Sequence, residues 1–500
     1  MWRPERRHVE RAGQTSSRSS ATCALLLAVL ACCAVALPPP RGIAEPPVWH
    51  WVDRFGGRGR DAPRAVAIGA AGEVYTTGQL AHVRAGGERS WSGEAARELM
   101  FLARHGAGGR REWLLRFGGS PVDEPRALAV ARDGTVLVAG LFTGELGLGS
   151  AAGLRPLRST GGADAFLIAI GDDGAPRWAL AWGGKHADVA RALTLDAAGN
   201  LYVAGTFQLT ADFDPGPGRR LMTSAGRTDV FVLKLDASRR LVWARRFGGD
   251  GADDVTALAV GADGSVYLGG SFEGRVWGAS DDGTPVAAAG AAIYVAALAP
   301  DGGSRWLRRF EAARGATLAG LAIAAEDAVY VGGGFQGGLR FEERPVLDNP
   351  AGWDLFSARL DDRGVLLWVR DVGADSDSSV TVESAVATGS GPLLGGSFQG
   401  TVDFDPGVGR SNLTAATTAG FVLALDGEGS LSWVGSPAAS GYSQVLALAA
   451  GDGKGAVVGV GQPDTTFRAA KATGNSPESG KSDVFVLSLD LGSAPRNGGR

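Results

Sequence analysis

The sequence predicts an all-β fold, a seven-bladed β-propeller with four antiparallel strands in each blade. Three observations indicate it: a tryptophan that recurs at a fixed period, four short apolar runs in each repeat, and two chain ends that each hold part of one blade. The tryptophans are spaced 62 to 65 residues apart, at Trp51, Trp113, Trp178, Trp243, Trp306, Trp368 and Trp433. Such a period is the signature of a repeat architecture.

One repeat, residues 191–249, shows how a blade is built. Its four apolar runs, each bounded by turn residues, are residues 192–195, 201–205, 229–235 and 241–247. Short runs of this kind predict four strands joined as an antiparallel meander. A single meander cannot bury both of its faces, so it has to stack against copies of itself. The first strands alternate alanine with larger residues, as at 127–130, which suits the crowding near a ring axis.

The two ends of the chain predict how the ring closes. Residues 48–55 resemble a lone fourth strand, Trp-x-x-Arg-Phe, whereas the strands expected at 445–448, 456–460 and 483–489 lack a fourth. Left apart, the two fragments would expose unpaired strand edges. We therefore expect the N-terminal strand to complete the last blade in a 3+1 arrangement, within a propeller that spans residues 48–492.

The segments outside the propeller predict export. Several arginines precede an apolar run from Ala21 to Leu37, with a small-x-small cleavage site ending at Ala36, which is typical of a signal peptide over residues 1–36. A proline-rich linker (37–47) and a C-terminal tail (493–500) complete the chain. We expect a secreted, periplasmic or cell-surface protein that is monomeric and has no transmembrane segment after cleavage.

The cysteines leave one alternative to free export. The run from Val29 to Cys32 resembles a lipobox, so a lipoprotein with a lipid anchor is the alternative location. All of the cysteines, Cys23, Cys32 and Cys33, lie in the leader, and cleavage after Ala36 would leave a chain with no thiol. Disulfides and thiolate metal sites are then excluded.

Charge and motif content argue against several functions. The formal net charge is −4, so the chain lacks the basic surface that nucleic-acid binding requires. The histidines outside the leader have no metal-ligand spacing, and neither a Gly-x-Ser-x-Gly nor a His-Glu-x-x-His motif is present. No catalytic residue is assigned, and no cofactor is expected apart from the calcium considered below.

Two resemblances accompany these patterns. From Trp49 to about Asp490 the repeat resembles that of the bacterial β-propeller family called SBBP. The shared pattern is Trp-x-x-x-Phe-Gly-Gly, an aspartate six residues after the Phe, and a hairpin into Val-Tyr-x-x-Gly. This resemblance implies a propeller and an export route. The run from Leu235 to Trp243 is similar to the tryptophan-docking repeats of quinoprotein propellers, which implies that the Trp packs between blades. It implies no quinone here, because the mature chain lacks their adjacent cysteines.

Acidic residues supply the candidate ligand-binding site. Four aspartates each lie six residues after the aromatic residue that ends a fourth strand. They are Asp61, Asp123, Asp188 and Asp253. In a meander, the connections between blades and the loops between second and third strands open at the same end. The Asp-Phe-Asp-Pro-Gly loops add candidate calcium ligands to that end, namely Asp212, Asp214, Asp403 and Asp405.

Each of these patterns also has a structural interpretation. Aspartate is common in turns because it bonds its own backbone, and in three blades an arginine follows three residues later, as Arg64 follows Asp61, which suggests ion pairs. The repeated Trp is better explained by packing between blades than by sugar stacking. We expect a binding or scaffold module for a protein, peptide or glycan; the alternative is an extracellular carbohydrate-active hydrolase or lyase using the same carboxylates.

Overall fold

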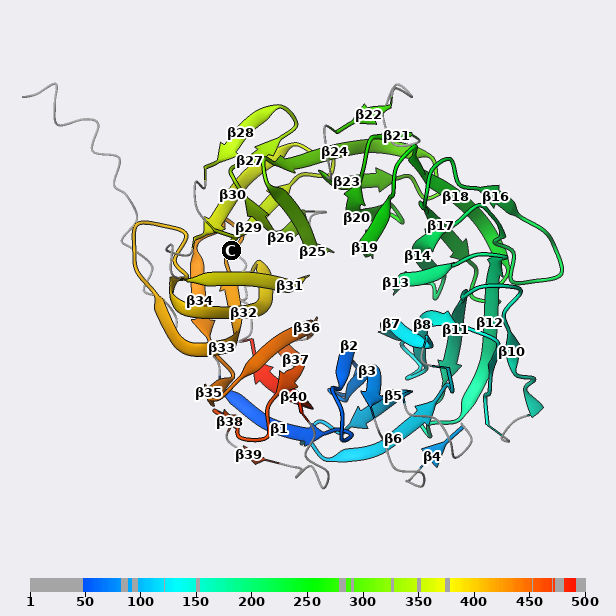
Figure 1. Ribbon diagram of the computed structural model, residues 1–500, viewed down its shortest axis with the longest axis horizontal. Coiled ribbons are helices and arrows are strands. Elements are labelled where there is room, and N and C mark those ends of the chain that lie inside the picture. The colour runs from blue at the N-terminus through cyan, green and yellow to red at the C-terminus, as the bar shows by residue number, and fades with distance from the viewer. Residues whose placement is uncertain are drawn as a thin grey trace, which may run out of the picture. The chain divides into compact units, whose positions relative to one another are not determined.

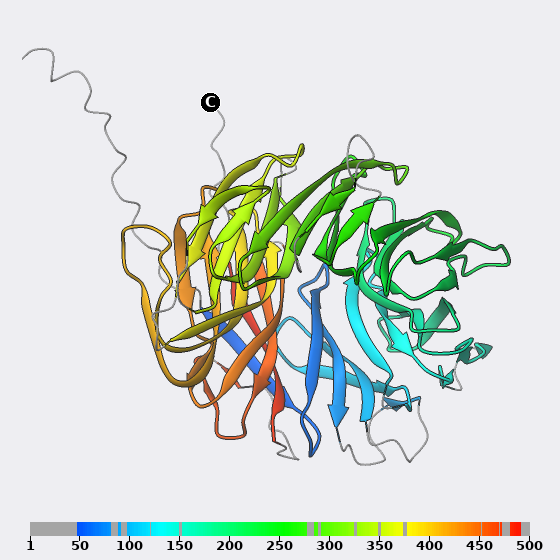
Figure 2. The same ribbon diagram turned by 45° about the horizontal axis from the view of Figure 1, so that its top comes forward.

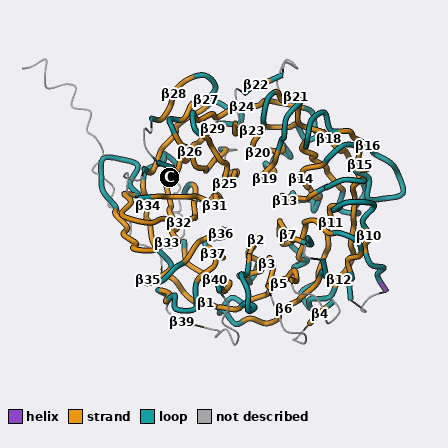
Figure 3. Tube along the Cα trace, in the orientation of Figure 1, coloured by secondary structure: helices purple, strands orange, loops and turns teal. Residues whose placement is uncertain are grey.

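The computed structural model consists almost entirely of strands and loops where it describes the chain (Figure 3). It describes residues 48–81, 89–91, 98–120, 122–149, 153–277, 285–288, 292–324, 328–348, 352–373, 378–451, 453–469, 471–472 and 481–491. The predicted signal peptide, linker, C-terminal tail and all cysteines lie outside the described residues. In these ranges, no helix has the length and apolar character needed to cross a membrane.

The sheets between Ala44 and Arg500 stand around a common centre as seven blades, with the first strand of each blade innermost (Figure 1). Blade 1 comprises β2 (Ala62–Ile68), β3 (Val74–Ala81), β5 (Glu98–His105), β6 (Arg111–Phe117) and the short β4 (Arg89–Ser90). Blade 2 comprises β7 (Glu124–Val130), β8 (Val136–Phe142), β11 (Asp164–Ile170) and β12 (Pro176–Gly184). Blade 3 comprises β13 (Val189–Leu195), β14 (Leu201–Phe207), β17 (Asp229–Leu235) and β18 (Leu241–Gly249).

The remaining blades repeat this order. Blade 4 comprises β19 (Asp254–Val260), β20 (Val266–Phe272), β23 (Ala292–Leu298) and β24 (Ser304–Ala312). Blade 5 comprises β25 (Gly315–Ile323), β26 (Val329–Gln336), β29 (Asp354–Leu360) and β30 (Leu366–Val372). Blade 6 comprises β31 (Ser379–Ala387), β32 (Pro392–Asp403), β33 (Asn412–Leu425) and β34 (Leu431–Gly435). The last sheet is β36 (Ser443–Gly451), β37 (Lys454–Gly461), β40 (Asp483–Asp490), β1 (Trp49–Phe55) and β39 (Lys471–Ala472).

Extra strands extend several blades, so the prediction of four strands per blade is incomplete. The loop between the second and third strands of one blade often folds into a hairpin that pairs with the outermost strand of the preceding blade. Thus β15 (Thr210–Asp212) and β16 (Leu221–Thr223), from blade 3, extend the sheet of blade 2 through β12. Likewise β21 (Arg275–Trp277) with β22 (Val286–Ala287) pairs with β18, and β27 (Leu339–Phe341) with β28 (Arg344–Leu347) pairs with β24.

Two further strand pairs stand apart from the blade sheets. They are the hairpin of β9 (Glu145–Leu146) with β10 (Leu157–Arg158), and β35 (Ala438–Ser440) with β38 (Thr466–Phe467). In the tilted view of Figure 2 the hairpins lie around the outside of the blades. Backbone hydrogen bonds of the β15–β16, β21–β22 and β27–β28 hairpins join blade 2 to 3, blade 3 to 4 and blade 4 to 5.

A glycine in every second strand allows the innermost hairpin to form. Each first strand carries a β-bulge, and opposite it stands Gly78, Gly140, Gly205, Gly270, Gly333, Gly396 or Gly459. A Cβ atom at any of these positions would lie only 1.9 to 2.3 Å from a carbonyl oxygen of the first strand. The Gly of the Val-Tyr-x-x-Gly pattern is therefore required by close backbone approach at a bulge.

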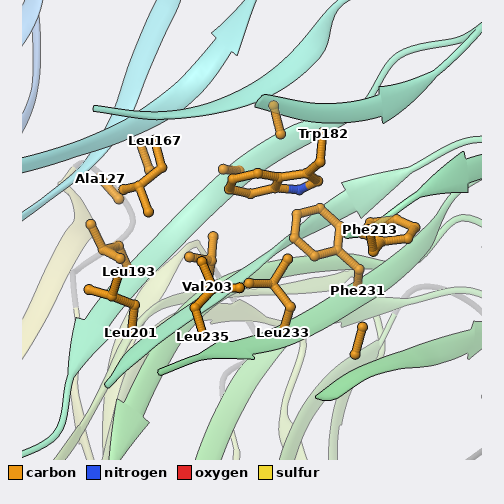
Figure 4. Packing of buried hydrophobic residues seen from close by; sticks show 14 of the residues in the cluster. Ala127, Leu167, Trp182, Leu193, Leu201, Val203, Phe213, Phe231, Leu233 and Leu235 are labelled. Carbon is orange, nitrogen blue, oxygen red and sulfur yellow. The ribbon is translucent and has the colours of Figure 1, made fainter. Parts of the chain in front are cut away.

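The hydrophobic core is divided among the spaces between blades. Between blades 2 and 3, Leu167 faces Leu193 and Val203, while the ring of Trp182 lies over Phe231 (Figure 4). The two rings are edge to face, 6.2 Å apart. A comparable cluster fills the space between the last sheet and blade 1. There β1, from the start of the described chain, pairs antiparallel with β40.

The bulge glycine gives the first prediction. Gly205→Ala should lower the free energy of unfolding by about 1–3 kcal/mol, because the new methyl group overlaps the carbonyl oxygen of Val189 and the ring of Phe231. The control is Gly451→Ala, a strand glycine with no atom within 4 Å of its hypothetical Cβ. Thermal unfolding followed by circular dichroism measures both. Equal melting temperatures for the two variants would contradict the explanation.

Candidate functional site on the long-loop face

The long-loop face is the end of the blades that carries the connections between blades and the loops between second and third strands. The predicted aspartates Asp61, Asp123, Asp188 and Asp253 lie just beneath this face, all buried. Each carboxylate accepts a hydrogen bond from the backbone N–H of the second glycine of the Gly-Gly pair, four residues earlier, at 2.6 to 3.0 Å. These four residues therefore lie at the junctions between consecutive blades.

Each junction aspartate also reaches the end of the second strand. The N–H of Ala81 donates to Asp61 and that of Thr143 donates to Asp123, both at 3.0 Å and both across 20 residues. At the same spacing, the backbone N–H of Gln208 points to the Asp188 carboxylate and that of Glu273 to the Asp253 carboxylate, and each lowers the pKa of its aspartate. The aspartate thus joins the entry of a blade to its own long loop.

At three junctions a second carboxylate comes from the first residue of a third strand. Asp483 lies beside Asp61, Asp164 beside Asp188 and Asp229 beside Asp253. The first glycine of each Gly-Gly pair makes room for both acids: a Cβ on Gly183 would lie 2.7 Å from Asp164 Oδ1 and 2.8 Å from Asp188 Oδ2.

Burial dominates the electrostatics of these pairs. The pKa of Asp61, Asp188 and Asp253 is raised to about 7, mainly by burial and in smaller part by the negative charge of the second acid, against the lowering effect of the backbone donors. Near neutral pH each of these junctions is therefore close to the point at which it exchanges a proton.

The pairs differ in their counter-ions, which come from the outermost strand. Arg54 contacts Asp483 at 3.3 Å and Arg246 contacts Asp229 at 2.9 Å. In blade 2 the corresponding residue is Ala181, opposite Phe166 as Arg246 is opposite Phe231. Burial raises the pKa of Asp164 as well, and its Oδ1 is buried with no hydrogen-bond donor among the described residues. The Asp164–Asp188 pair is thus the least compensated of the three.

An arginine follows three of the junction aspartates by three residues, and it pairs with a different acid. Arg64 contacts Glu124 at 2.5 Å and Arg191 contacts Asp254 at 2.9 Å, and both pairs link the first strands of neighbouring blades. Arg126 instead contacts Glu124 of its own strand at 2.6 Å. Local and interblade ion pairs are therefore both present, but their acid is the one that opens a first strand rather than the junction aspartate.

The first Asp-Phe-Asp-Pro-Gly loop is held together by its own carboxylates. Asp212 Oδ1 accepts from the N–H of Asp214 and of Arg220, and Asp214 Oδ1 accepts from Gly216. The intervening Phe213 is buried against Phe231, with ring centres 4.9 Å apart.

Blade 6 repeats this geometry. Asp403 accepts from Asp405 and Ser411, Asp405 accepts from Gly407, and Phe404 packs on Phe421. The candidate calcium ligands therefore act as acceptors within their own loops. In the described ranges, no group of three or more histidine, cysteine or acidic side chains is placed to hold a metal ion.

Two hollows open on the long-loop face. One of about 250 Å³ between blades 3 and 4 is lined by Arg191, Asp253 and Glu273, among others. A larger groove of about 1030 Å³ lies between the connection at residues 311–315 and the β27–β28 hairpin. Sequence reasoning missed this groove, because neither segment belongs to the repeated pattern.

An exposed tryptophan borders the larger groove. Trp353 keeps 37% of its surface exposed, and its ring lies within 3.6 Å of the position a Cβ would take on Gly315 in the groove wall. Other large apolar residues exposed in the long loops and connections are Val122, Leu209, Leu221 and Val408.

Comparisons with known proteins add a distant likeness. The sequence matches no protein-family model, and no curated protein matches it. Its structure is similar to virginiamycin B lyase from Staphylococcus aureus at 9% identity and a TM-score of 0.31, over 69% of this chain and 94% of that chain. It is also similar to an endosialidase of phage phi92 (8% identity, TM-score 0.35, 90% of this chain and 70% of that chain). For puromycin hydrolase the values are 13% identity and a TM-score of 0.36, over 83% of this chain and 54% of that chain. Scores this low give no indication of what this chain binds.

The raised pKa of Asp188 predicts an unusual pH dependence of stability. The folded protein keeps a proton on this group that the unfolded chain releases near pH 4, so the group's contribution to stability falls as pH rises from about 4 to about 7. Asp188→Asn keeps an oxygen acceptor for Gly184 without the charge. We expect it to raise the melting temperature at pH 8 more than at pH 5.

The matched control is Asp123→Asn. Leu99 occupies the position of the second acid in blade 1, and both carboxylate oxygens of Asp123 accept backbone bonds. This variant should lower the melting temperature at both pH values, because one of those bonds is lost. A lowered melting temperature for Asp188→Asn at pH 8 would contradict the assignment.

Proposed function

We propose that the protein is an exported binding or scaffold module that holds a protein, peptide or glycan on its long-loop face. The observation that supports this proposal most strongly is the groove of about 1030 Å³ with Trp353 at its edge. Arg314 and Arg340 also line it, together with the apolar side chains of Leu339, Val346 and Leu347. An aromatic anchor beside a mixed apolar and cationic lining is the composition that interfaces favour.

The position of the junction carboxylates supports binding over catalysis. Asp61, Asp123, Asp188 and Asp253 accept hydrogen bonds from the backbone that they organise, so their loss would disturb the junctions themselves. Asp253 is the residue that favours the alternative of a hydrolase or lyase, since burial raises its pKa to about 7 and it lines the smaller hollow. Its Oδ2 nevertheless accepts from Gly249 at 2.7 Å, as in a structural junction.

We further propose that the chain belongs with the SBBP-type repeat propellers and leaves the cytoplasm through its N-terminal leader. The shared roles of the repeated residues support the first part: in four blades the Gly-Gly-x-x-x-Asp run forms the junction, and in all seven the second-strand glycine lies at a bulge. Calcium binding by the Asp-Phe-Asp loops stays a prediction.

Binding through the groove can be tested with one pair of variants. A peptide or glycan selected on the wild-type protein from display libraries should lose about 2 kcal/mol of binding free energy in Trp353→Ala, measured by calorimetry, because an aromatic anchor is removed. The control is Val365→Ala, which truncates an exposed apolar residue at the opposite end of blade 5 and should bind as the wild type does. Undiminished binding by Trp353→Ala would place the site elsewhere.

We also propose that β1 closes the ring through β40. The register from Val52↔Leu487 to Phe55↔Val484 and the packing of Trp51 and Phe55 into the core beside blade 1 support this. Deleting residues 48–56 should leave the edge of β40 unpaired and give an aggregating protein, seen by size-exclusion chromatography. Moving the same residues to follow Leu491 should restore the monomeric peak. A deletion that stays folded would disprove closure by β1.

A further inference from the structure

The repeated tryptophan has the same two contacts in most blades. Its indole N–H donates to a carbonyl in the turn between the third and fourth strands of the next blade, at 2.8 to 3.1 Å. The donors that do so are Trp51, Trp113, Trp243, Trp306 and Trp368.

Glycine in that turn makes the contact close. Two residues after the acceptor carbonyl, all five of these junctions have a glycine with positive φ: Gly109, Gly174, Gly302, Gly364 and Gly429. A Cβ on Gly109, Gly302, Gly364 or Gly429 would lie 2.4 to 3.0 Å from the indole ring. At these junctions the ring closes the space between two blades because the turn residue has no side chain.

Trp178 of blade 2 departs from this rule. The corresponding turn residue in blade 3 is Arg239, which holds the same left-handed conformation (φ 67°) although it is not glycine. Its guanidinium lies over the Trp178 ring, 5.2 Å from the centre. In the described part of the chain the Trp178 indole N–H has no acceptor, and this residue is partly exposed whereas its six counterparts are buried.

A groove of about 730 Å³ opens where Trp178 fails to close the junction. It lies on the face opposite the long loops, because turns between third and fourth strands form its outer wall. Leu137, Leu195 and Leu201 contribute apolar lining, Trp178 and Arg239 line its outer part, and Arg132 lines its inner part. This volume lies within the range of small-molecule sites.

The groove lining carries two cations and two acids, Arg132 and Arg239 with Asp133 and Asp196. Arg132 also lines a neighbouring cavity of about 350 Å³, to which Lys454 at the start of β37 contributes. Among the described residues, neither arginine nor Lys454 forms an ion pair. Hydrogen bonds hold the two acids in their turns: Asp133 accepts from Thr135, and Asp196 accepts from its own turn and from Tyr202.

We propose that this groove binds an acidic oligosaccharide, a chain of sugar rings that each carry a carboxylate. The C–H face of one ring packs on the flat indole of Trp178, which is partly exposed. The guanidinium groups of Arg239 and Arg132 bind successive carboxylates, since their planar forks match that group in geometry and charge. A single anionic ring would use only one of the two arginines, which line the outer and inner parts of the groove, so an oligomer is favoured. This site is separate from the proposed long-loop groove.

Substitutions at residue 239 test the proposal because they change the groove in opposite ways. Arg239→Gly restores the glycine of the other junctions, so Trp178 should close the space, the melting temperature should rise, and binding of trigalacturonate should be lost in calorimetry. Arg239→Ala keeps a Cβ that holds the groove open but lacks the charge. It should bind at least about tenfold more weakly than the wild type, which corresponds to about 1.4 kcal/mol.

Three probes and one variant complete the experiment. Trigalacturonate should bind more weakly as salt increases. At low salt, neutral maltotriose and the monomer galacturonate should each bind at least about tenfold more weakly than trigalacturonate. Trp353→Ala should bind trigalacturonate as the wild type does, so that failure here and failure of the long-loop site can be told apart. The proposal would be overturned by any of three results: trigalacturonate fails to bind the wild type, it binds Arg239→Gly undiminished, or it binds no better than maltotriose or galacturonate.

Discussion

Both faces of nearly every sheet in this protein are apolar, and this constraint governs the rest of the structure. The side chains of β14 and β17 are buried on both sides, against blade 2 in one direction and blade 4 in the other. A blade without neighbours would expose this surface to water, so stability resides in the junctions rather than in the sheets. Three repeated features are accordingly found at junctions: the aspartate that accepts from Gly-Gly, the tryptophan that donates to the next turn, and the hairpin that extends the preceding sheet.

The same constraint explains why acids are buried at these junctions. A connection that turns sharply between two blades leaves backbone N–H groups away from water, and a carboxylate satisfies two or three of them at once. Burying a second acid beside it raises the free energy of the charged state, which Arg54 and Arg246 offset in two blades and Ala181 does not. The junctions therefore differ in charge balance although they share one backbone geometry.

The sequence predicts the features that recur in every repeat. It misses the contacts that depend on how strands of the folded blades pair. Seven tryptophans and seven strand glycines recur because each blade needs them, and they predict the seven-bladed fold. The Gly-Gly pairs recur at four junctions and predict the placement of the four aspartates there. The pairing of β15 with β12 could not be predicted, because the long loops carry no period. Arg246 beside Asp229 follows from a strand register that only the folded sheet defines. Trp353 and the groove beside it come from segments unique to blade 5.

Departures from a repeat are informative because the repeat shows what folding alone requires. Arg239 holds a left-handed conformation that costs a residue with a side chain about 1–2 kcal/mol. It also leaves Trp178 without the hydrogen bond of its counterparts, a loss of about 1 kcal/mol. A glycine at this position would avoid both costs, as it does at five other junctions. Among the described residues Arg239 stacks on one ring and forms no ion pair, and these contacts offset little of the cost. The unfavourable residue is best explained by what the open groove admits, since a propeller selected only for stability would have closed it.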